Sequence, residues 1–305
     1  MGERFYDFWR VDVFTDKPLQ GNPLAVFPRA TGLSREEMEG ITREMNLSET
    51  TFVFPPTNPA AHYRNRIFTP GGEIPFAGHP SLGTAYVAAL EGLVPKPEGR
   101  SVVYQELEIG VLPLELFIEN GQIQKVVMTQ GEPSVGRSLT SVEGLAKALS
   151  VRPRDLGKGK LKPQVASTGI PSLQVPMRSL AAVQGIDYDM RELGKFLAKL
   201  GPHHLAYVFS FETTDPAVQV HARAFSPQDA IREDPATGSA AGACGTYLAA
   251  NGALPAPSFV IEQGLEMKHA SRIEVSVEAE GKVPKAVKVG GRVTPLIRGS
   301  LRLPG

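Results

Sequence analysis

Apolar residues recur along the chain with two different spacings, one typical of helices and one typical of strands. After Ser34, a helical face is formed by Met38, Ile41 and Met45, and Glu37 completes a capping box with Ser34. The segments 111–118, 123–128, 273–277 and 287–293 show the alternation of apolar and polar residues that is typical of strands. The chain is therefore predicted to belong to the α+β class.

Two further segments, 80–90 and 240–250, have the length of helices but carry no charged residue on any face. A helix that is apolar or small all round must be buried all round. We therefore predict two lobes, each a curled, mostly antiparallel β-sheet or barrel around a buried central helix.

The two lobes are predicted to be copies of one unit, because short motifs recur in the same order. Arg66-Ile67-Phe68-Thr69-Pro70 returns as Arg223-Ala224-Phe225-Ser226-Pro227. Further upstream, Gly21-Asn22-Pro23 returns as Gly169-Ile170-Pro171. Self-similarity of this kind indicates an internal duplication that covers most of the chain.

Finer matches support the duplication and locate its boundary. Gln105 is matched with Gln263, and His204 takes the place of Glu49. Between the copies, the segment 151–160 is rich in Pro, Gly and charge, as exposed connections are. We place the first lobe at 1–150 and the second at 151–305.

The balance of charges narrows the class of partner. The 305 residues include 32 Lys plus Arg and 32 Asp plus Glu, so the chain lacks the excess of positive charge that is typical of a nucleic-acid binder. No apolar run approaches the roughly 20 residues that cross a bilayer, so no membrane partner is expected. Cys244 has no second cysteine to pair with, and the first residues lack the layout of a signal peptide, which predicts a cytoplasmic protein.

Chemistry is expected where the two apolar helices begin. One start is Gly78-His79-Pro80, with Pro80 at the first helical position, and the other runs from Asp234 to Ser239, with Ser239 as N-cap. The unpaired N–H groups of a helix start can bind a carboxylate, although ordinary capping explains most such starts. If the lobes faced one another about a pseudo-twofold axis, both starts would converge on one cleft.

Three side chains near these starts can exchange protons: Glu49, His79 and Asp234. A lone Glu is usually a solvated surface residue and a lone His is usually structural, so the pattern alone leaves both interpretations open. His203-His204 and His221 lack the spacing of metal ligands, and no metal is expected.

Five stretches, in this order, resemble the phenazine-biosynthesis PhzF family. They are Val11-Asp12-Val13-Phe14-Thr15 with Gly21-Asn22-Pro23, Ser48-Glu49-Thr50, Arg66-Ile67-Phe68-Thr69-Pro70 to Gly78-His79-Pro80, and Asp234-Pro235-Ala236-Thr237-Gly238-Ser239. That family has the diaminopimelate-epimerase fold, with two similar lobes that each wrap strands around a central helix. The resemblance implies the same fold here, and it implies a homodimer.

The resemblance also assigns roles to the matched residues. Glu49 would take a proton from one carbon of the substrate and return it to another, with His79 and Asp234 as its catalytic partners. The implied substrate-binding residues are Ser48, Gly78, Gly238 and Ser239. The substrate would be a small cyclic or unsaturated carboxylate, and the proton transfer requires no cofactor. Two-base racemases of this fold carry a cysteine at each helix start, whereas His79 and Ser239 stand there in this chain.

The sequence leaves one preferred function and two alternatives. The preferred one is a cofactor-independent isomerase of the PhzF type that acts by Glu49-mediated proton transfer. One alternative is a non-catalytic binding or interaction protein of the same fold. The other is a two-base epimerase or racemase in which His79 or Asp234 is the second base.

Overall fold

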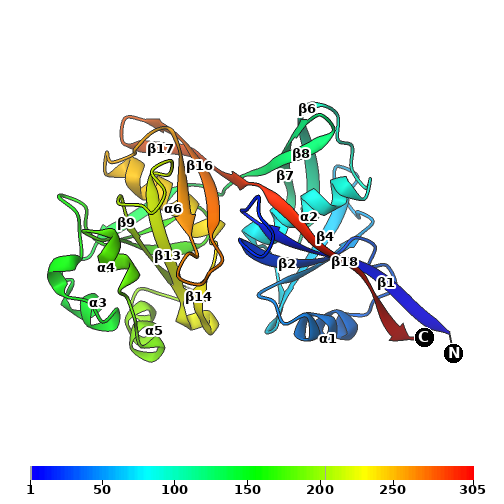
Figure 1. Ribbon diagram of the computed structural model, residues 1–305, viewed down its shortest axis with the longest axis horizontal. Coiled ribbons are helices and arrows are strands. Elements are labelled where there is room, and N and C mark those ends of the chain that lie inside the picture. The colour runs from blue at the N-terminus through cyan, green and yellow to red at the C-terminus, as the bar shows by residue number, and fades with distance from the viewer. Residues whose placement is uncertain (1, 203) are drawn as a thin grey trace. The chain divides into compact units, whose positions relative to one another are not determined.

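The computed structural model describes residues 2–202 and 204–305 and divides into two compact units. Unit 1 comprises the residues up to Met128 together with Gly290–Gly305, and unit 2 comprises Thr129–Val289. This division differs from the contiguous lobes predicted with a boundary at residue 150. The reason is that the C-terminal strand β18 (Val293–Pro304) pairs with the N-terminal strand β1 (Glu3–Val13), as Figure 1 shows in red and blue.

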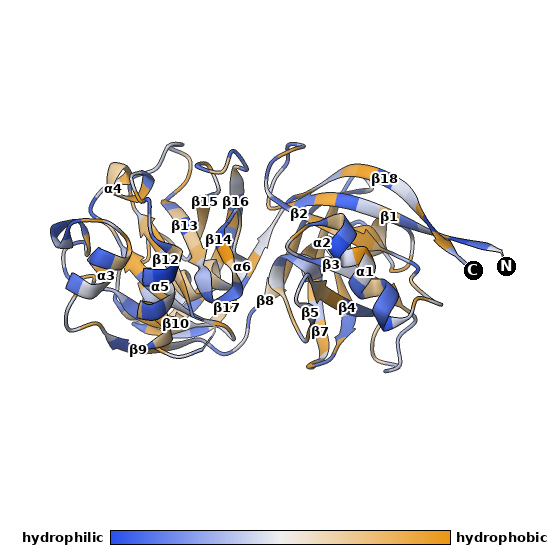
Figure 2. Ribbon diagram, turned by 90° about the horizontal axis from the view of Figure 1, so that it is seen from below, coloured by the Kyte–Doolittle hydropathy of each residue, from blue (hydrophilic) through white to orange (hydrophobic). Residues whose placement is uncertain are grey.

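Unit 1 is a mixed sheet with two helices. Its remaining strands are β2 (Asn22–Phe27), β3 (Thr50–Phe54), β4 (Tyr63–Thr69), β5 (Gly72–Ile74), β6 (Gly99–Leu107), β7 (Gly110–Glu119) and β8 (Gln122–Thr129). Strands β2 and β3 are parallel, β3 and β4 antiparallel, β4 and β6 parallel, and β6 and β7 antiparallel. Polar and apolar residues alternate along β1 and β18, as the hydropathy colours of Figure 2 show.

Helix α1 (Arg35–Met45) begins as the sequence predicts. The Ser34 side chain accepts a hydrogen bond from the Glu37 backbone N–H, and the Glu37 carboxylate accepts one from the Ser34 N–H. The helix buries Met38 and Ile41 against the phenylalanines of β2, β3 and β4. The capping box and the apolar face are thus both confirmed, and α1 delivers the chain to the start of β3.

Helix α2 (Gly78–Leu90) is buried among strands. Ten of its 13 residues are buried, and it contacts β1, β2, β3, β4, β7 and β18. Small residues allow this close packing: a Cβ added at Gly83 would lie 2.6 Å from Leu24 Cδ2. The absence of charge in the segment 80–90 therefore has a packing cause.

Unit 2 has the same order of parallel and antiparallel strand pairings as unit 1, but it carries different helices. Its strands are β9 (Ser134–Ser138), β10 (Gln164–Ser167), β11 (Pro171–Pro176), β12 (Leu205–Ser210), β13 (Val220–Ser226), β14 (Ile231–Asp234), β15 (Ser258–Gln263), β16 (Ser271–Glu280) and β17 (Val283–Gly291). Strands β11 and β12 are parallel, β12 and β13 antiparallel, β13 and β15 parallel, and β15 and β16 antiparallel. The strand expected at 287–293 is split, because β17 ends at Gly291 and β18 begins at Val293.

The helices of unit 2 fall into two groups. Helix α6 (Gly238–Ala250) has eleven of its 13 residues buried and contacts β9, β10, β11 and β16. Cys244 lies inside this helix, where burial raises the pKa of its thiol. The others are α3 (Glu143–Ala148), α4 (Leu180–Gln184), α5 (Met190–Ala198) and the short 3-10 helices Pro153–Asp155 and Pro227–Asp229. Helices α3, α4 and α5 share a separate apolar cluster with β11 and β12.

Both units contain the same local hydrogen bonds. In unit 1 the Glu106 carboxylate accepts from the Thr57 N–H, the Thr57 hydroxyl and the Asn58 N–H. In unit 2 the Glu262 carboxylate accepts from the Thr214 N–H, the Thr214 hydroxyl and the N–H of the next residue. The match of Gln105 with Gln263 was therefore wrong, because the strand register aligns Glu106 with Glu262.

The protein as a whole is a mixed α+β fold that is rich in strands and has few helices. Among the residues described, no helix has both the length and the apolar character needed to span a membrane.

Candidate active site

Glu49 lies at the end of the loop between α1 and β3, and its side chain turns inward. Only 15% of that side chain is exposed. Burial raises the pKa of the Glu49 carboxyl, and the neighbouring Ser48 side chain only partly offsets this effect. The solvated surface glutamate that the sequence left open is thus not what the structure contains.

His79 is the second residue of α2 and lies beside Glu49. Its Nε2 atom is 3.3 Å from Glu49 Oε2, and its side chain is 9% exposed. On the other edge of the ring, His79 Nδ1 is 3.4 Å from Nδ2 of Asn22, a residue that is completely buried. Two of the predicted acid–base groups are therefore brought together, and Asn22 is a third member that the sequence reasoning did not assign.

The first turn of α2 lacks a side-chain cap. Its N-cap residue, Ala77, offers no acceptor, so the N–H groups of Gly78 and His79 point from the positive end of the helix dipole without a capping side chain. Pro80 is the third residue of the helix and not the first, as the sequence had suggested. This helix start has the chemistry of an anion site next to Glu49.

The other predicted residues lie in unit 2. Asp234 ends β14, and its carboxylate accepts a hydrogen bond from the Thr237 hydroxyl. Gln263, fully buried, donates to the Asp234 carbonyl at 2.7 Å and accepts from the Thr237 N–H at 3.2 Å, which holds the turn in place. Gly238 is the first residue of α6, and the N-cap is Thr237, so the assignment of Ser239 as N-cap was wrong.

The residue of unit 2 that corresponds to Glu49 is apolar. Thr50 pairs with Phe68 in unit 1, and Ala206 pairs with Phe225 in unit 2. Glu49 directly precedes Thr50, and Leu205 directly precedes Ala206. His204 lies one place before Leu205. The expected equivalence of Glu49 and His204 was therefore off by one residue, which in a strand means the opposite face.

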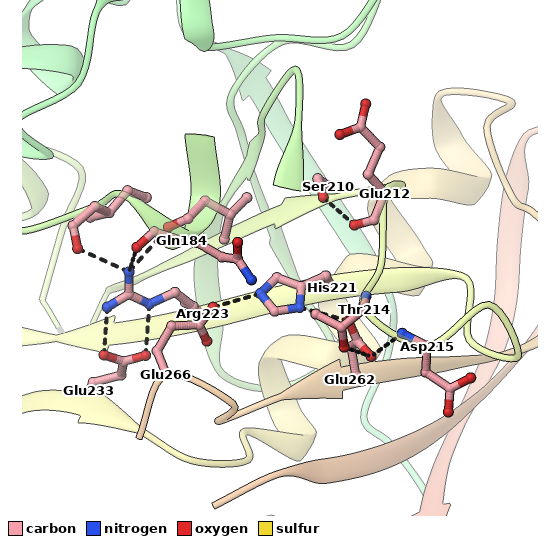
Figure 3. A network of polar contacts seen from close by, with 12 residues as sticks. Gln184, Ser210, Glu212, Thr214, Asp215, His221, Arg223, Glu233, Glu262 and Glu266 are labelled. Carbon is pink, nitrogen blue, oxygen red and sulfur yellow. Dashed lines mark hydrogen bonds and ion pairs between the residues drawn. The ribbon is translucent and has the colours of Figure 1, made fainter. Parts of the chain in front are cut away.

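Unit 2 also contains a buried charge cluster that the sequence reasoning missed. His221 is fully buried between two carboxylates, with Nδ1 2.8 Å from Glu262 and Nε2 3.0 Å from Glu266 (Figure 3). Burial by itself lowers the pKa of His221, but the hydrogen bonds to both glutamates outweigh it and raise the pKa to about 9. The pKa values of both glutamates are lowered, because the contacts with His221 outweigh burial.

A second ion pair extends this cluster. Arg223 forms two hydrogen bonds with Glu233, at 2.9 and 2.8 Å, and it donates to backbone carbonyls at the end of α4 (Figure 3).

The described residues contain no group of three or more His, Cys, Asp or Glu side chains suited to a metal ion. His203, which was weighed as a ligand, lies outside the described residues.

A family model described as phenazine biosynthesis-like protein matches residues 11–299. The chain belongs to this family. The match covers the motifs around Glu49, His79 and Asp234, and the resemblance inferred from the sequence is thereby confirmed.

Individual relatives of the phenazine biosynthesis-like family span the same length. The chain is 35% identical to trans-2,3-dihydro-3-hydroxyanthranilate isomerase of Pseudomonas aeruginosa over 92% of this chain and 94% of that protein. It is 32% identical to an uncharacterized isomerase of Clostridium acetobutylicum over 98% and 99%, respectively. The solved structure of a PhzF family protein from Bacillus anthracis is 28% identical and superposes with a TM-score of 0.87, covering 98% of this chain and 99% of that one.

Proposed function

We propose that the protein is an isomerase in which Glu49 moves a proton between two carbons of a small cyclic or unsaturated carboxylate. The observation that carries the proposal is the buried Glu49 carboxyl beside His79 at the uncapped start of α2. Relatives that match this chain over most of its length are named isomerases. One of them acts, by its name, on a dihydro-hydroxyanthranilate.

The proposed step conserves all atoms of the substrate. The Glu49 carboxylate accepts a proton from one carbon, the electron pair shifts through the conjugated system, and the carboxyl returns a proton to another carbon. A general acid–base group works best when its pKa lies near the working pH, and burial raises the pKa of Glu49 toward that range. The transfer itself needs neither an oxidant nor a reductant.

The substrate carboxylate is proposed to bind at the start of α2. The N–H groups of Gly78 and His79 and the helix dipole favour an anion there. Ser48 is proposed to contact the substrate as well as Glu49. In unit 2, Asp234, Gly238 and Ser239 remain proposed substrate-contacting residues on the basis of the family resemblance, with Asp234→Asn and Ser239→Ala expected to raise KM.

Two further proposals concern the whole chain. We infer that the two units descend from one duplicated unit with a central helix, which the shared order of strand pairings and the Glu106 and Glu262 hydrogen bonds support. We also retain the homodimer that the resemblance implies. Multi-angle light scattering of the purified protein tests it, and a monomer mass would refute it.

The function is tested with trans-2,3-dihydro-3-hydroxyanthranilate as the probe, followed by NMR in deuterium oxide. The wild type is expected to form an isomer that carries solvent deuterium at a carbon. Glu49→Gln keeps the size of the side chain but cannot accept a proton, so the rate should fall by about 10²- to 10⁴-fold. Glu44→Gln, which changes an exposed glutamate on α1, is the matched control and should retain the wild-type rate.

Two results would overturn the proposal. One is a Glu49→Gln variant that isomerises the probe at a rate within about threefold of the wild type. The other is a wild type that binds the probe in calorimetry but neither isomerises it nor exchanges its carbon-bound hydrogen, which would favour a binding protein. Inversion of a stereocentre without a double-bond shift would instead identify an epimerase.

A further inference from the structure

Asn22 occupies a position that the backbone defines closely. It is the first residue of β2 and pairs with Val13 of β1. The preceding Gly21 has a φ of +70°, and a Cβ there would lie 2.4 Å from the Val13 carbonyl oxygen, so only glycine fits this turn. The turn therefore sets the direction of the buried Asn22 side chain, which reaches the ring of His79.

His79 lies between two different groups. On one edge, Nε2 faces the Glu49 carboxyl at 3.3 Å, and on the other edge, Nδ1 faces Asn22 Nδ2 at 3.4 Å. A neutral imidazole carries one proton, so one nitrogen donates and the other accepts. The amide nitrogen of Asn22 is a donor only, which makes Nδ1 the acceptor and puts the proton on Nε2.

This arrangement suits the Glu49 carboxylate. An ionised carboxylate is only an acceptor, and an Nε2–H group gives it a donor. The opposite arrangement would need a protonated Glu49 that donates to Nε2, an Nδ1–H group and an amide turned so that its oxygen faces the ring. The orientation of Asn22 therefore selects between two proton arrangements of the Glu49 and His79 pair.

Unit 2 provides an internal comparison. Strand register matches Asn22 with Ile170 and Glu49 with Leu205. Helices α2 and α6 both have 13 residues and begin at a glycine, which matches His79 with Ser239. At the matching places unit 2 has two apolar residues and a serine, so the amide, carboxyl and imidazole of unit 1 are all replaced, as expected if they work as one set.

We infer that Asn22 is a positioning residue that fixes the tautomer of His79, so that the imidazole presents Nε2–H to Glu49. The inference rests on the proposed function for its catalytic meaning but not for its test. Asn22 does not touch the reacting atoms, and it acts through His79. Its loss should therefore change the protonation of the ring and the kcat before it changes substrate affinity.

The tautomer is read by long-range ¹H–¹⁵N correlation NMR of the ¹⁵N-labelled full-length protein at neutral pH. The signals of His79 are assigned among the six histidines by their loss in His79→Gln. The wild type is expected to show protonated Nε2 and bare Nδ1. Protonated Nδ1 with bare Nε2 in the wild type would overturn the inference, and this result needs no variant to fold.

Two variants sharpen the test. Asn22→Asp puts His79 between two carboxylates, and the ring should then carry protons on both nitrogens, as His221 does between Glu262 and Glu266. Asn22→Ile copies the residue at the matching place of unit 2 and should leave a mixture of tautomers. Both variants should lose about 10²-fold or more in kcat with a smaller change in KM, since holding a catalytic His in the wrong tautomer costs about 10⁴ in serine proteases.

The outcomes separate this inference from the proposed function. A wild type with protonated Nε2 but no isomerase activity would refute the function alone. An active wild type with protonated Nδ1 would refute the inference alone. Asn22→Ile with a single Nε2–H tautomer and a kcat within about threefold of the wild type would also refute the inference.

Discussion

The two units each bury a histidine against glutamate, and they treat the pair in opposite ways. In unit 1, His79 meets Glu49 at 3.3 Å, and burial raises the pKa of that carboxyl. In unit 2, His221 meets Glu262 at 2.8 Å and Glu266 at 3.0 Å, and the pKa values of both carboxyls are lowered. The same residue types therefore form a pair in unit 1 whose carboxyl has a raised pKa, and a charged cluster in unit 2 whose carboxyls have lowered pKa values.

The number of donors around the carboxylate explains the difference. Glu262 accepts hydrogen bonds from the Thr214 N–H and hydroxyl and from the Asp215 N–H, in addition to His221. These contacts stabilise its charge and outweigh burial. For Glu49, the lowering effect of the neighbouring Ser48 side chain does not compensate for burial. A well-satisfied charge is suited to stability, and a poorly satisfied one is suited to proton transfer.

The largest effect that tests this comparison is on stability. His221→Gln removes the cation from between Glu262 and Glu266, and we expect a loss of about 3–5 kcal/mol in the free energy of unfolding at pH 6, because two buried carboxylates lose their partner. Urea denaturation followed by circular dichroism measures it. His62→Gln, at an exposed histidine, is the control and should change stability by less than about 1 kcal/mol.

A smaller effect is the pH dependence of that stability. Because the pKa of His221 rises from 6.5 to about 9 on folding, the unfolded chain releases this proton at a lower pH than the folded chain. The contribution is complete below pH 6.5 and is lost as the pH rises to 9, and it amounts to about 3 kcal/mol at 1.36 kcal/mol per unit. The difference in unfolding free energy between wild type and His221→Gln should shrink over this range.

A constant difference between pH 6 and pH 9.5 would contradict the charged state of His221. The two glutamates give the opposite sign. Their lowered pKa values stabilise the fold above pH 4.5, and that contribution is lost as the pH falls through their folded-state values. Glu262→Gln should therefore flatten the acid limb of the wild-type stability curve.

Local signals in the sequence predicted several features of unit 1 correctly. Ser34 and Glu37 form the expected capping box because that motif depends only on neighbours in one helix turn. The uncharged segment 80–90 is a buried helix because burial on all sides forbids charge. Glu49 and His79 were singled out near the helix starts, the family resemblance gave them roles, and the structure brings their side chains together.

Features that depend on strand register could not be predicted in this way. His204 was matched with Glu49, but the pairing of β12 with β13 shifts the match to Leu205. The boundary at residue 150 overlooked the return of β18 to β1, which is a contact between the two ends of the chain. Asn22 stood in a quoted motif without a role, because its contact with His79 joins positions that are distant in sequence.

The charge cluster of unit 2 was missed for the same reason. Glu262 and Glu266 follow His221 only after β14 and α6 have intervened, so no spacing rule relates them. The available signal was the proposed duplication, because aligning Glu106 with Glu262 would have marked both as acceptors for the matching Thr57 and Thr214 loops.

The central claim is that the glutamate beside His79 holds its proton to a higher pH than a free glutamate, whereas those beside His221 release theirs early. A ¹³C NMR titration of the glutamate carboxyl groups tests this directly, with assignments from Glu49→Gln, Glu262→Gln and Glu266→Gln. The account predicts that Glu49 titrates above 4.5 and that Glu262 and Glu266 titrate below it. A Glu49 signal that titrates at or below 4.5 would contradict the account.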